Sequence, residues 1–212
     1  MSSLFHFVSL NLNYRMALTI TQMSLEIIVG PMFAGKSSAL LSRIRRNKAI
    51  GKRVMVLTSS LDKRYSVAPL IISHDKDSVD AIAVSTLSPC TDFREYQVAD
   101  LIVIEEAQFF PDLRSFIEVG LSAGKNFVIC GLDGDISAKP FGQVLECIPL
   151  ADSVVKMTAL CEQCGDGTPA IFTAARATRA KGLDTIQIGA HETYIPLCRK
   201  HYLGQITSKA IY

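Results

Sequence analysis

A short stretch of the chain, GPMFAGKS (Gly30–Ser37), has the residue types needed to hold a nucleoside triphosphate. It matches the phosphate-loop pattern G-x-x-x-x-G-K-[ST] at every fixed position, with an apolar run before it and a helical pattern after it. Two glycines allow backbone N–H groups to approach phosphate oxygens closely. Lys36 would place a charge on the β- and γ-phosphates, and the Ser37 hydroxyl would bind Mg²⁺. The stretch predicts a triphosphate site but leaves the destination of the γ-phosphate open.

Two adjacent carboxylates, Glu105 and Glu106, end the apolar run LIVI. A phosphate-loop site needs a carboxylate at the end of a neighbouring strand to organise Mg²⁺, and Glu105, the first acid, is the better candidate for it. Glu106 is then a candidate general base that takes a proton from an attacking hydroxyl. The alternative interpretation is a pair of solvated charges at a strand end, because carboxylates usually lie at the surface.

Four further residues have the spacing of a zinc site: Cys161 and Cys164 form one C-x₂-C pair, and Cys198 and His201 form a C-x₂-H pair. Tetrahedral zinc takes four nitrogen or sulfur ligands, and a set filled by protein leaves no position for water, so the site is predicted to be structural. A redox pair or free thiols are the alternatives. A redox pair formed by Cys161 and Cys164 would not need the matching pair Cys198 and His201.

These residues require a scaffold of alternating strands and helices. Apolar β-rich runs predict strands over 25–29, 53–58, 81–84, 100–110, 126–131 and 153–160, and apolar periodicity predicts helices from Lys36 to Ile50 and from Pro111 to about Gly124. The alternation predicts an α/β fold of the P-loop (RecA-like) class, a parallel sheet with helices on both faces. The composition changes at Cys161, where a small zinc-binding domain is expected to begin; the resemblance described below adds a substrate-gripping loop to this domain.

Composition limits the other possibilities. The chain has 212 residues, of which 49% are hydrophobic, and its net charge of +2 gives no strong case for a nucleic-acid or membrane surface. The domains expected are a disordered extension (1–24), a nucleotide-binding kinase domain (25–160), a zinc-binding domain (161–203) and a tail (204–212). An ATP site implies a reducing, cytoplasmic compartment, and Cys130 and Cys147 are interpreted as small core residues.

Several motifs in the same order resemble the cellular and poxviral type of thymidine kinase. They are GPMFAGKSS, RIRR, DKRY (62–65), EEAQFF (105–110), LDGD followed by KPFG (132–142), PLADSVVKMTALCEQC (149–164) and YIPLCRKHY (194–202). The resemblance covers about residues 25–203. It implies transfer of the γ-phosphate of ATP to the 5′-hydroxyl of thymidine, with deoxyuridine as a further expected substrate, to give dTMP in nucleotide salvage.

The resemblance also assigns roles on the phosphate side. It makes Glu106 the catalytic carboxylate and puts Glu105 where the family has a Mg²⁺-organising Asp, one methylene shorter. Ala107 replaces the usual Gly. The residues implied to bind ATP and Mg²⁺ are Gly30, Pro31, Met32, Phe33, Ala34, Gly35, Lys36, Ser37, Ser38, Asp62, Arg64, Glu105 and Gln108. Among them, Arg64 would help to neutralise transition-state charge.

A second set is implied to contact the nucleoside: Met32, Gln108, Phe109, Leu132, Ile136, Phe141, Thr173, Thr185, Ile186, Gln187, Ile188, Gly189 and Tyr194. Ile136 replaces an aromatic ring, so stacking on the base is expected to be weaker or to come from another residue. Residues 185–189 would use backbone groups, which need no particular side chain. Plain core packing is the alternative interpretation for the apolar members and for Tyr194.

Three functions are consistent with these motifs. A thymidine kinase with ATP, Mg²⁺ and structural Zn²⁺ leads, and the resemblance adds a homotetramer and inhibition by dTTP. A simple ATPase with a structural zinc module would use water as its nucleophile. A nucleic-acid-binding zinc module on an ATP-sensing domain is disfavoured, because the net charge of the chain is near neutral.

Overall fold

The computed structural model describes residues 23–61, 70–72, 78–176 and 193–209. Six apolar runs form one sheet in the order β5-β2-β6-β7-β1-β8, and every neighbouring pair is parallel. The strands are β1 (Leu25–Val29), β2 (Val54–Ser59), β5 (Ile82–Val84), β6 (Leu101–Ile104), β7 (Phe127–Gly131) and β8 (Ser153–Lys156). The predicted parallel sheet is confirmed, and its carboxyl ends lie along one edge.

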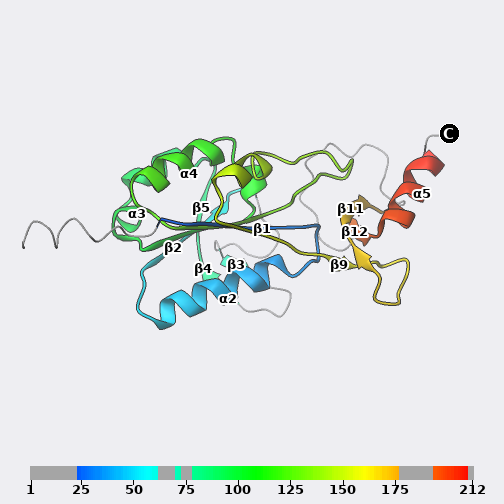
Figure 1. Cartoon of the computed structure of the whole chain (residues 1–212), viewed down its shortest axis with the longest axis horizontal. Helices are drawn as coiled ribbons and strands as arrows, with labels where there is room; N and C mark the ends of the chain where they lie inside the picture. Colours follow the sequence, from blue (N-terminus) through cyan, green and yellow to red (C-terminus); the bar gives the residue numbers. More distant parts are fainter. Residues whose placement is uncertain (1–22, 62–69, 73–77, 177–192, 210–212) are drawn as a thin grey trace, which may run out of the picture.

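Helices cover both faces of this sheet (Figure 1). On one face α2 (Lys36–Ala49) buries Leu40, Leu41 and Ile44, where they join Ile28 and other side chains of β1, β2, β6 and β7. On the other face lie α3 (Arg94–Val98) and α4 (Leu113–Ser122), whose buried side chains pack against the opposite side of the same strands. Because both faces are covered, the central strands are apolar throughout.

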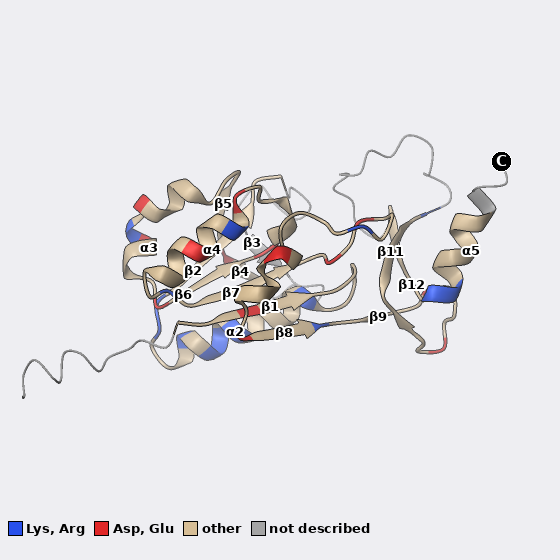
Figure 2. Cartoon of the chain, turned by 45° about the horizontal axis from the view of Figure 1, so that its top comes forward, with Lys and Arg blue, Asp and Glu red and all other residues tan. Residues whose placement is uncertain are grey.

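The polar side of α2 carries a cluster of basic residues, visible along the helix in Figure 2. Arg45, Arg46 and Lys48 are exposed, as the sequence pattern predicts. Arg43 is half-buried instead, and its guanidinium forms an ion pair of 2.8 Å with Glu26 of β1. This contact ties the helix to the first strand of the sheet.

A smaller module lies beyond the carboxyl edge of the sheet, at the right of Figure 1. It contains two short antiparallel pairs, β9 (Ala159–Leu160) with β10 (Pro169–Ala170) and β11 (Phe172–Ala175) with β12 (Tyr194–Leu197). Helix α5 (Arg199–Lys209) follows and includes part of the stretch predicted as a tail. A third pair, β3 (Leu70–Ile72) with β4 (Ser78–Asp80), lies beside the sheet. Short 3₁₀ segments η1 (Ser88–Asp92), η2 (Ala107–Phe109) and η3 (Leu145–Leu150) complete the described elements.

The single strand predicted over residues 153–160 is wrong, because the structure divides it into β8 and β9. The chain leaves the sheet at Met157, whose N–H donates to the carbonyl of Val29 at 2.8 Å. It then passes next to Gly30, where an added Cβ would lie 2.4 Å from the Met157 carbonyl oxygen. The connection between sheet and module is therefore packed directly against the start of the phosphate loop.

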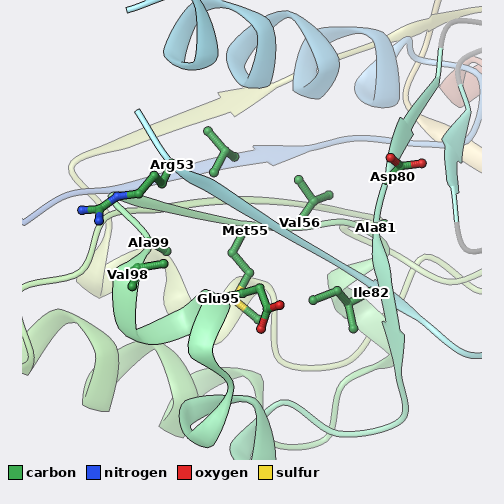
Figure 3. Close-up of a pocket in the computed structure, with 10 residues that line it drawn as sticks. Arg53, Met55, Val56, Asp80, Ala81, Ile82, Glu95, Val98 and Ala99 are labelled. Carbon is green, nitrogen blue, oxygen red and sulfur yellow. The ribbon is translucent and has the colours of Figure 1, made fainter. Parts of the chain in front are cut away.

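A hollow of about 320 Å³ lies at the opposite edge of the sheet (Figure 3). Its lining comes from the start of β2, from Asp80–Ile82 and from the end of α3. Since the phosphate loop follows the carboxyl end of β1, this hollow is not part of the nucleotide site. No helix among the described residues is long and apolar enough to cross a bilayer.

One buried hydroxyl offers a test of the packing. Within the described part of the chain, the hydroxyl of Tyr96 is buried and has no hydrogen-bond partner. A buried polar group in that state costs about 1–3 kcal/mol, so Tyr96→Phe is expected to leave the free energy of unfolding unchanged or to raise it by about 1 kcal/mol. The ring itself packs 5.7 Å from that of Phe116, so Tyr96→Leu should be destabilising. Urea unfolding measures both, and a clear loss of stability in Tyr96→Phe would contradict the assignment.

Candidate active site and zinc cluster

The phosphate loop connects β1 to α2 and depends on two glycines. Gly30 has φ 151° and lies against the Met157 carbonyl, so any side chain there would collide with backbone. Gly35 has φ 77° and forms the N-cap of α2, which brings the positive end of the helix to the loop. The ammonium of Lys36 donates to the Pro31 carbonyl at 2.7 Å and so lies folded over the loop. The loop has the geometry that anion binding requires.

Glu105 lies next to the loop, at the end of β6. Its carboxylate accepts a hydrogen bond of 2.7 Å from the Ser37 hydroxyl, although the two residues are far apart in sequence. Its backbone N–H donates to Leu57 at 2.9 Å, and the residue is only 7% exposed. The structure thus brings together the two groups predicted to organise Mg²⁺. The longer side chain of Glu reaches the Ser37 hydroxyl directly.

Glu106 is half-buried and has φ 50° and ψ 42°, in the left-handed region. That region is uncommon for residues other than glycine and is enriched at functional sites. The side chain of Gln108 donates from Nε2 to Glu106 Oε2 at 2.5 Å, and its Oε1 accepts from the N–H of Leu132 at 3.0 Å. Ala107 is fully buried in the core beneath, so its methyl group is accommodated where the family usually has Gly.

The nucleoside positions lie in two groups. Phe109 and Phe141 are in edge-to-face contact with ring centroids 5.6 Å apart, and Leu132 begins the segment after β7. Ile136 is half-buried, and its carbonyl accepts from the Tyr202 hydroxyl of α5 at 2.9 Å. Tyr194 is 6% exposed in β12, where it pairs with Ala175. The structure brings Phe109 and Phe141 together and connects the segment that contains Ile136 to the small module.

Thr173 of β11 connects that module to the phosphate loop. Its hydroxyl accepts a hydrogen bond of 3.0 Å from the backbone N–H of Met32, and the residue is 5% exposed. Phe33 and Ala34 of the loop also pack with Ala174, Ile195 and Leu197 of the module. Thr173 was predicted to be a nucleoside contact, and its contact with the loop is an additional finding.

Replacing Thr173 by Val keeps its shape and removes the acceptor for the Met32 N–H. We expect the apparent KM for ATP to rise about 5- to 10-fold, because one unmade hydrogen bond to a part-buried donor costs about 1–1.5 kcal/mol. Steady-state kinetics with varied ATP measures the effect. Thr173→Ser, which keeps the hydroxyl, is the control and should stay within about twofold of the parent. Equal KM values for the Val and Ser variants would show that the contact does not support the loop.

One ion pair near the loop was not predicted from the sequence. The Lys156 ammonium lies 2.8 Å from a carboxylate oxygen of Asp133, whose side chain is 13% exposed. Because β1 lies between β7 and β8, this pair bridges across the strand that leads into the loop. The motif LDGD marks the stretch, but only the strand order shows its partner.

Beneath the loop, Cys130 is buried at the end of β7, as the sequence predicts for a small core residue. Burial raises the pKa of this thiol well above its ordinary value, against the lowering effect of Lys36. It is therefore a neutral thiol. Cys147 is likewise buried, and burial raises its pKa to about 11.

The four predicted metal ligands meet in the module. The Sγ atoms of Cys161, Cys164 and Cys198 lie 3.4, 3.4 and 3.5 Å from His201 Nδ1, and Cys164 and Cys198 are 3.8 Å apart at sulfur. A tetrahedron with Zn–S and Zn–N bonds of typical length has edges of about 3.8 Å between sulfurs and about 3.5 Å from sulfur to nitrogen. The cluster therefore fits zinc in ligand type, number and spacing.

The module has a small apolar core around this cluster. Ala159, Ala170, Ala174 and Leu197 are buried beside Cys161 and Cys198, and the ring of Phe172 stacks on Tyr202 at 4.2 Å. The buried residues are mostly small. Such a core is weak support for so many short elements, which favours a structural role for the metal.

Several predicted positions are outside the described residues. They are Asp62 and Arg64 on the phosphate side and Thr185, Ile186, Gln187, Ile188 and Gly189 on the nucleoside side. Their assignments remain predictions. The other predicted site residues all lie in described segments.

Comparison with known proteins decides the family. The family model described as thymidine kinase matches residues 23–202. The chain belongs to the thymidine kinase family. The family predicted from the motifs is confirmed, and with it the prediction of an ATP-dependent phosphotransferase rather than a binding module.

The relatives include plant, animal and viral proteins. Thymidine kinase of Oryza sativa subsp. japonica is 43% identical over 88% of this chain and 69% of its own length. Cytosolic thymidine kinase of Homo sapiens is 35% identical over 89% and 77%, and thymidine kinase of vaccinia virus (strain Ankara) is 35% identical over 85% and 97%. Among solved structures, domain III of the Thermotoga maritima replication initiation protein DnaA matches with a TM-score of 0.40 and 18% identity, over 69% of this chain and 61% of its own.

Proposed function

We propose that this chain transfers the γ-phosphate of ATP to the 5′-hydroxyl of thymidine, and also of deoxyuridine, to give the nucleoside monophosphate. The observation that carries the proposal is the pair of carboxylates at the end of β6. Glu105 accepts a hydrogen bond from the loop residue Ser37, and Glu106 accepts one from the side chain of Gln108. We therefore assign Glu105 to the phosphate side and Glu106 to the acceptor hydroxyl.

On the phosphate side, the chain supplies charge and oxygen ligands. Backbone N–H groups of Phe33–Ser37 and the Lys36 ammonium would bind the phosphates, and Asp62 and Arg64 are proposed to lie beside them. The Ser37 hydroxyl and the Glu105 carboxylate are hard oxygen donors that fit Mg²⁺, and both would hold it. Bound Mg²⁺ supplies positive charge that stabilises the negative charge developing on the transferred group.

On the acceptor side, Glu106 is proposed as the general base. A carboxylate acts in this role when it lies within hydrogen-bond reach of the hydroxyl whose proton it takes. The 5′-oxygen then attacks the γ-phosphorus in line with the leaving ADP. Phe109, Phe141 and Leu132 would border the base, and residues 185–189 would bind its edge through backbone groups. The zinc cluster would hold the module that contributes these contacts.

Family membership supports three further proposals. The protein is proposed to be cytoplasmic, in agreement with the names of the cytosolic relatives from Cricetulus griseus and Homo sapiens. It is also proposed to form a homotetramer and to be inhibited by dTTP. Size-exclusion chromatography and a dTTP titration test the last two.

The proposal is tested by incubation with ATP, Mg²⁺ and a panel of nucleosides. Thymidine and deoxyuridine should each yield a monophosphate together with one ADP, and purine nucleosides should not. A simple ATPase, the alternative, would release ADP equally fast without a nucleoside. Equal release would overturn the kinase proposal.

A further inference from the structure

We infer that Gln108 is a positioning residue for the catalytic carboxylate: its amide holds Glu106 in place rather than contacting the nucleoside or ATP. This inference rests on the proposed role of Glu106 as general base. The motif resemblance implies that Gln108 lies beside the substrates. The structure instead uses both ends of its amide group within the protein.

The orientation of the amide follows from its partners. The N–H of Leu132 can only donate, so the group 3.0 Å from it must be the amide oxygen of Gln108. The amide nitrogen is then turned toward Glu106, where it donates to Oε2 at 2.5 Å. A reversed amide would place an oxygen against a carboxylate and a nitrogen against an N–H. The network therefore allows one orientation only.

Two glycines lie against Gln108, one at its side chain and one at its backbone. At Gly131 an added Cβ would lie 2.7 Å from Gln108 Oε1, and at Gly142 it would lie 2.1 Å from the Gln108 carbonyl oxygen. Gly131 thus leaves room for the amide of Gln108, and Gly142 leaves room for its backbone. Gln108 is 3% exposed, so its amide has little surface to offer a ligand.

The amide joins two structural elements at the site. Glu106 follows β6, and Leu132 follows β7, which pairs with β6 in the sheet. The Gln108 amide is hydrogen-bonded to the Glu106 carboxylate, after β6, and to the Leu132 N–H, after β7. It therefore links the ends of two neighbouring strands. A left-handed backbone such as that of Glu106 persists only where surrounding contacts hold the residue, and the hydrogen bond from Gln108 is one such contact. A base displaced by about 1 Å loses on the order of 10²-fold in rate.

Two substitutions separate the two hydrogen bonds. Gln108→Met has a similar shape and removes both bonds. Gln108→Glu keeps an acceptor for the Leu132 N–H but removes the donor to Glu106. We expect kcat to fall about 10- to 100-fold in both variants, with KM for thymidine and for ATP within about threefold of the parent. Gln97→Met, a matched change at an exposed position of α3, is the control and should leave both constants unchanged.

Three results would overturn the inference. A raised thymidine KM with retained kcat would show that Gln108 contacts the nucleoside. A near-normal kcat in Gln108→Glu would show that only the Leu132 bond matters, and this arm remains decisive if Gln108→Met fails to fold. The third result concerns the double variant. If Gln108 acts through Glu106, Gln108→Met should cost less than about twofold in a Glu106→Gln background, and a full additive loss contradicts that.

The same measurements separate this inference from the proposed function. If Glu106→Gln alone keeps its turnover, the role of Glu106 as base is wrong. If Glu106→Gln is inactive while both Gln108 variants keep kcat, only the positioning role is wrong. Thermal unfolding of each variant shows whether a loss of rate reflects a loss of folded protein.

Discussion

Glu106→Gln is expected to lower kcat by about 10²- to 10⁴-fold, the usual contribution of a positioned general base. The substitution preserves size and removes the group that accepts the proton of the attacking hydroxyl. Binding of ATP should change little, because the contacts proposed to hold the phosphates come from the loop and from Glu105. Stopped-time assays of dTMP formation measure the rate, and equilibrium binding of a non-hydrolysable ATP analogue measures the affinity.

A matched change at Glu105 is the control for this experiment. Glu105→Gln alters the acid bonded to Ser37, so its main effect should be on the Mg²⁺ concentration that gives half-maximal rate. Glu106→Gln should not shift that concentration. If the two variants behave alike, the division of labour between the two acids is wrong.

Removal of zinc is expected to have the largest effect on stability. Structural zinc in small domains contributes about 10–16 kcal/mol of apparent binding free energy, which is also folding free energy. Chelation, or Cys164→Ser, should therefore unfold the module that contains β9–β12 and abolish activity. Hydrogen exchange of residues 159–176 and 193–209 reports the unfolding, and metal analysis reports the zinc content.

The six cysteines provide an internal control for the zinc experiment. Cys147 is buried in the main core and distant in the fold from the cluster, so Cys147→Ala should keep one zinc per chain at a modest cost in stability. Metal-free protein that keeps its fold and activity would contradict a structural role for the cluster.

The main sheet and most of the site could be predicted from the sequence because short stretches of consecutive residues indicate them. Apolar runs followed by Gly30 or by Glu105 mark strand ends, and a parallel sheet brings those ends to one edge. The C-x₂-C and C-x₂-H pairs predicted the cluster that the structure assembles. The sequence therefore predicts which residues surround the phosphate loop, whereas the distances between them come from the structure.

Other features depend on contacts between distant segments and have no local signal. The strand predicted over 153–160 divides because Met157 must pass the loop, which nothing in its own sequence indicates. The β9–β10 and β11–β12 pairs are too short and too poor in apolar alternation to predict. The family resemblance places Gln108 beside the substrates, and nothing in its local sequence indicates that Gly131 leaves room for its amide.

Phe33 and Ala34 give the phosphate loop a second neighbour besides its nucleotide. Their side chains belong to the same apolar cluster as Leu197 and Cys198, and the Met32 N–H is bonded to Thr173. Because the loop and the module contact each other, the free energy of ATP binding at the loop should also stabilise the zinc module by thermodynamic linkage. A nucleotide bound at the loop should protect the module against proteolysis, and a cell short of zinc should lose nucleotide affinity before it loses the sheet.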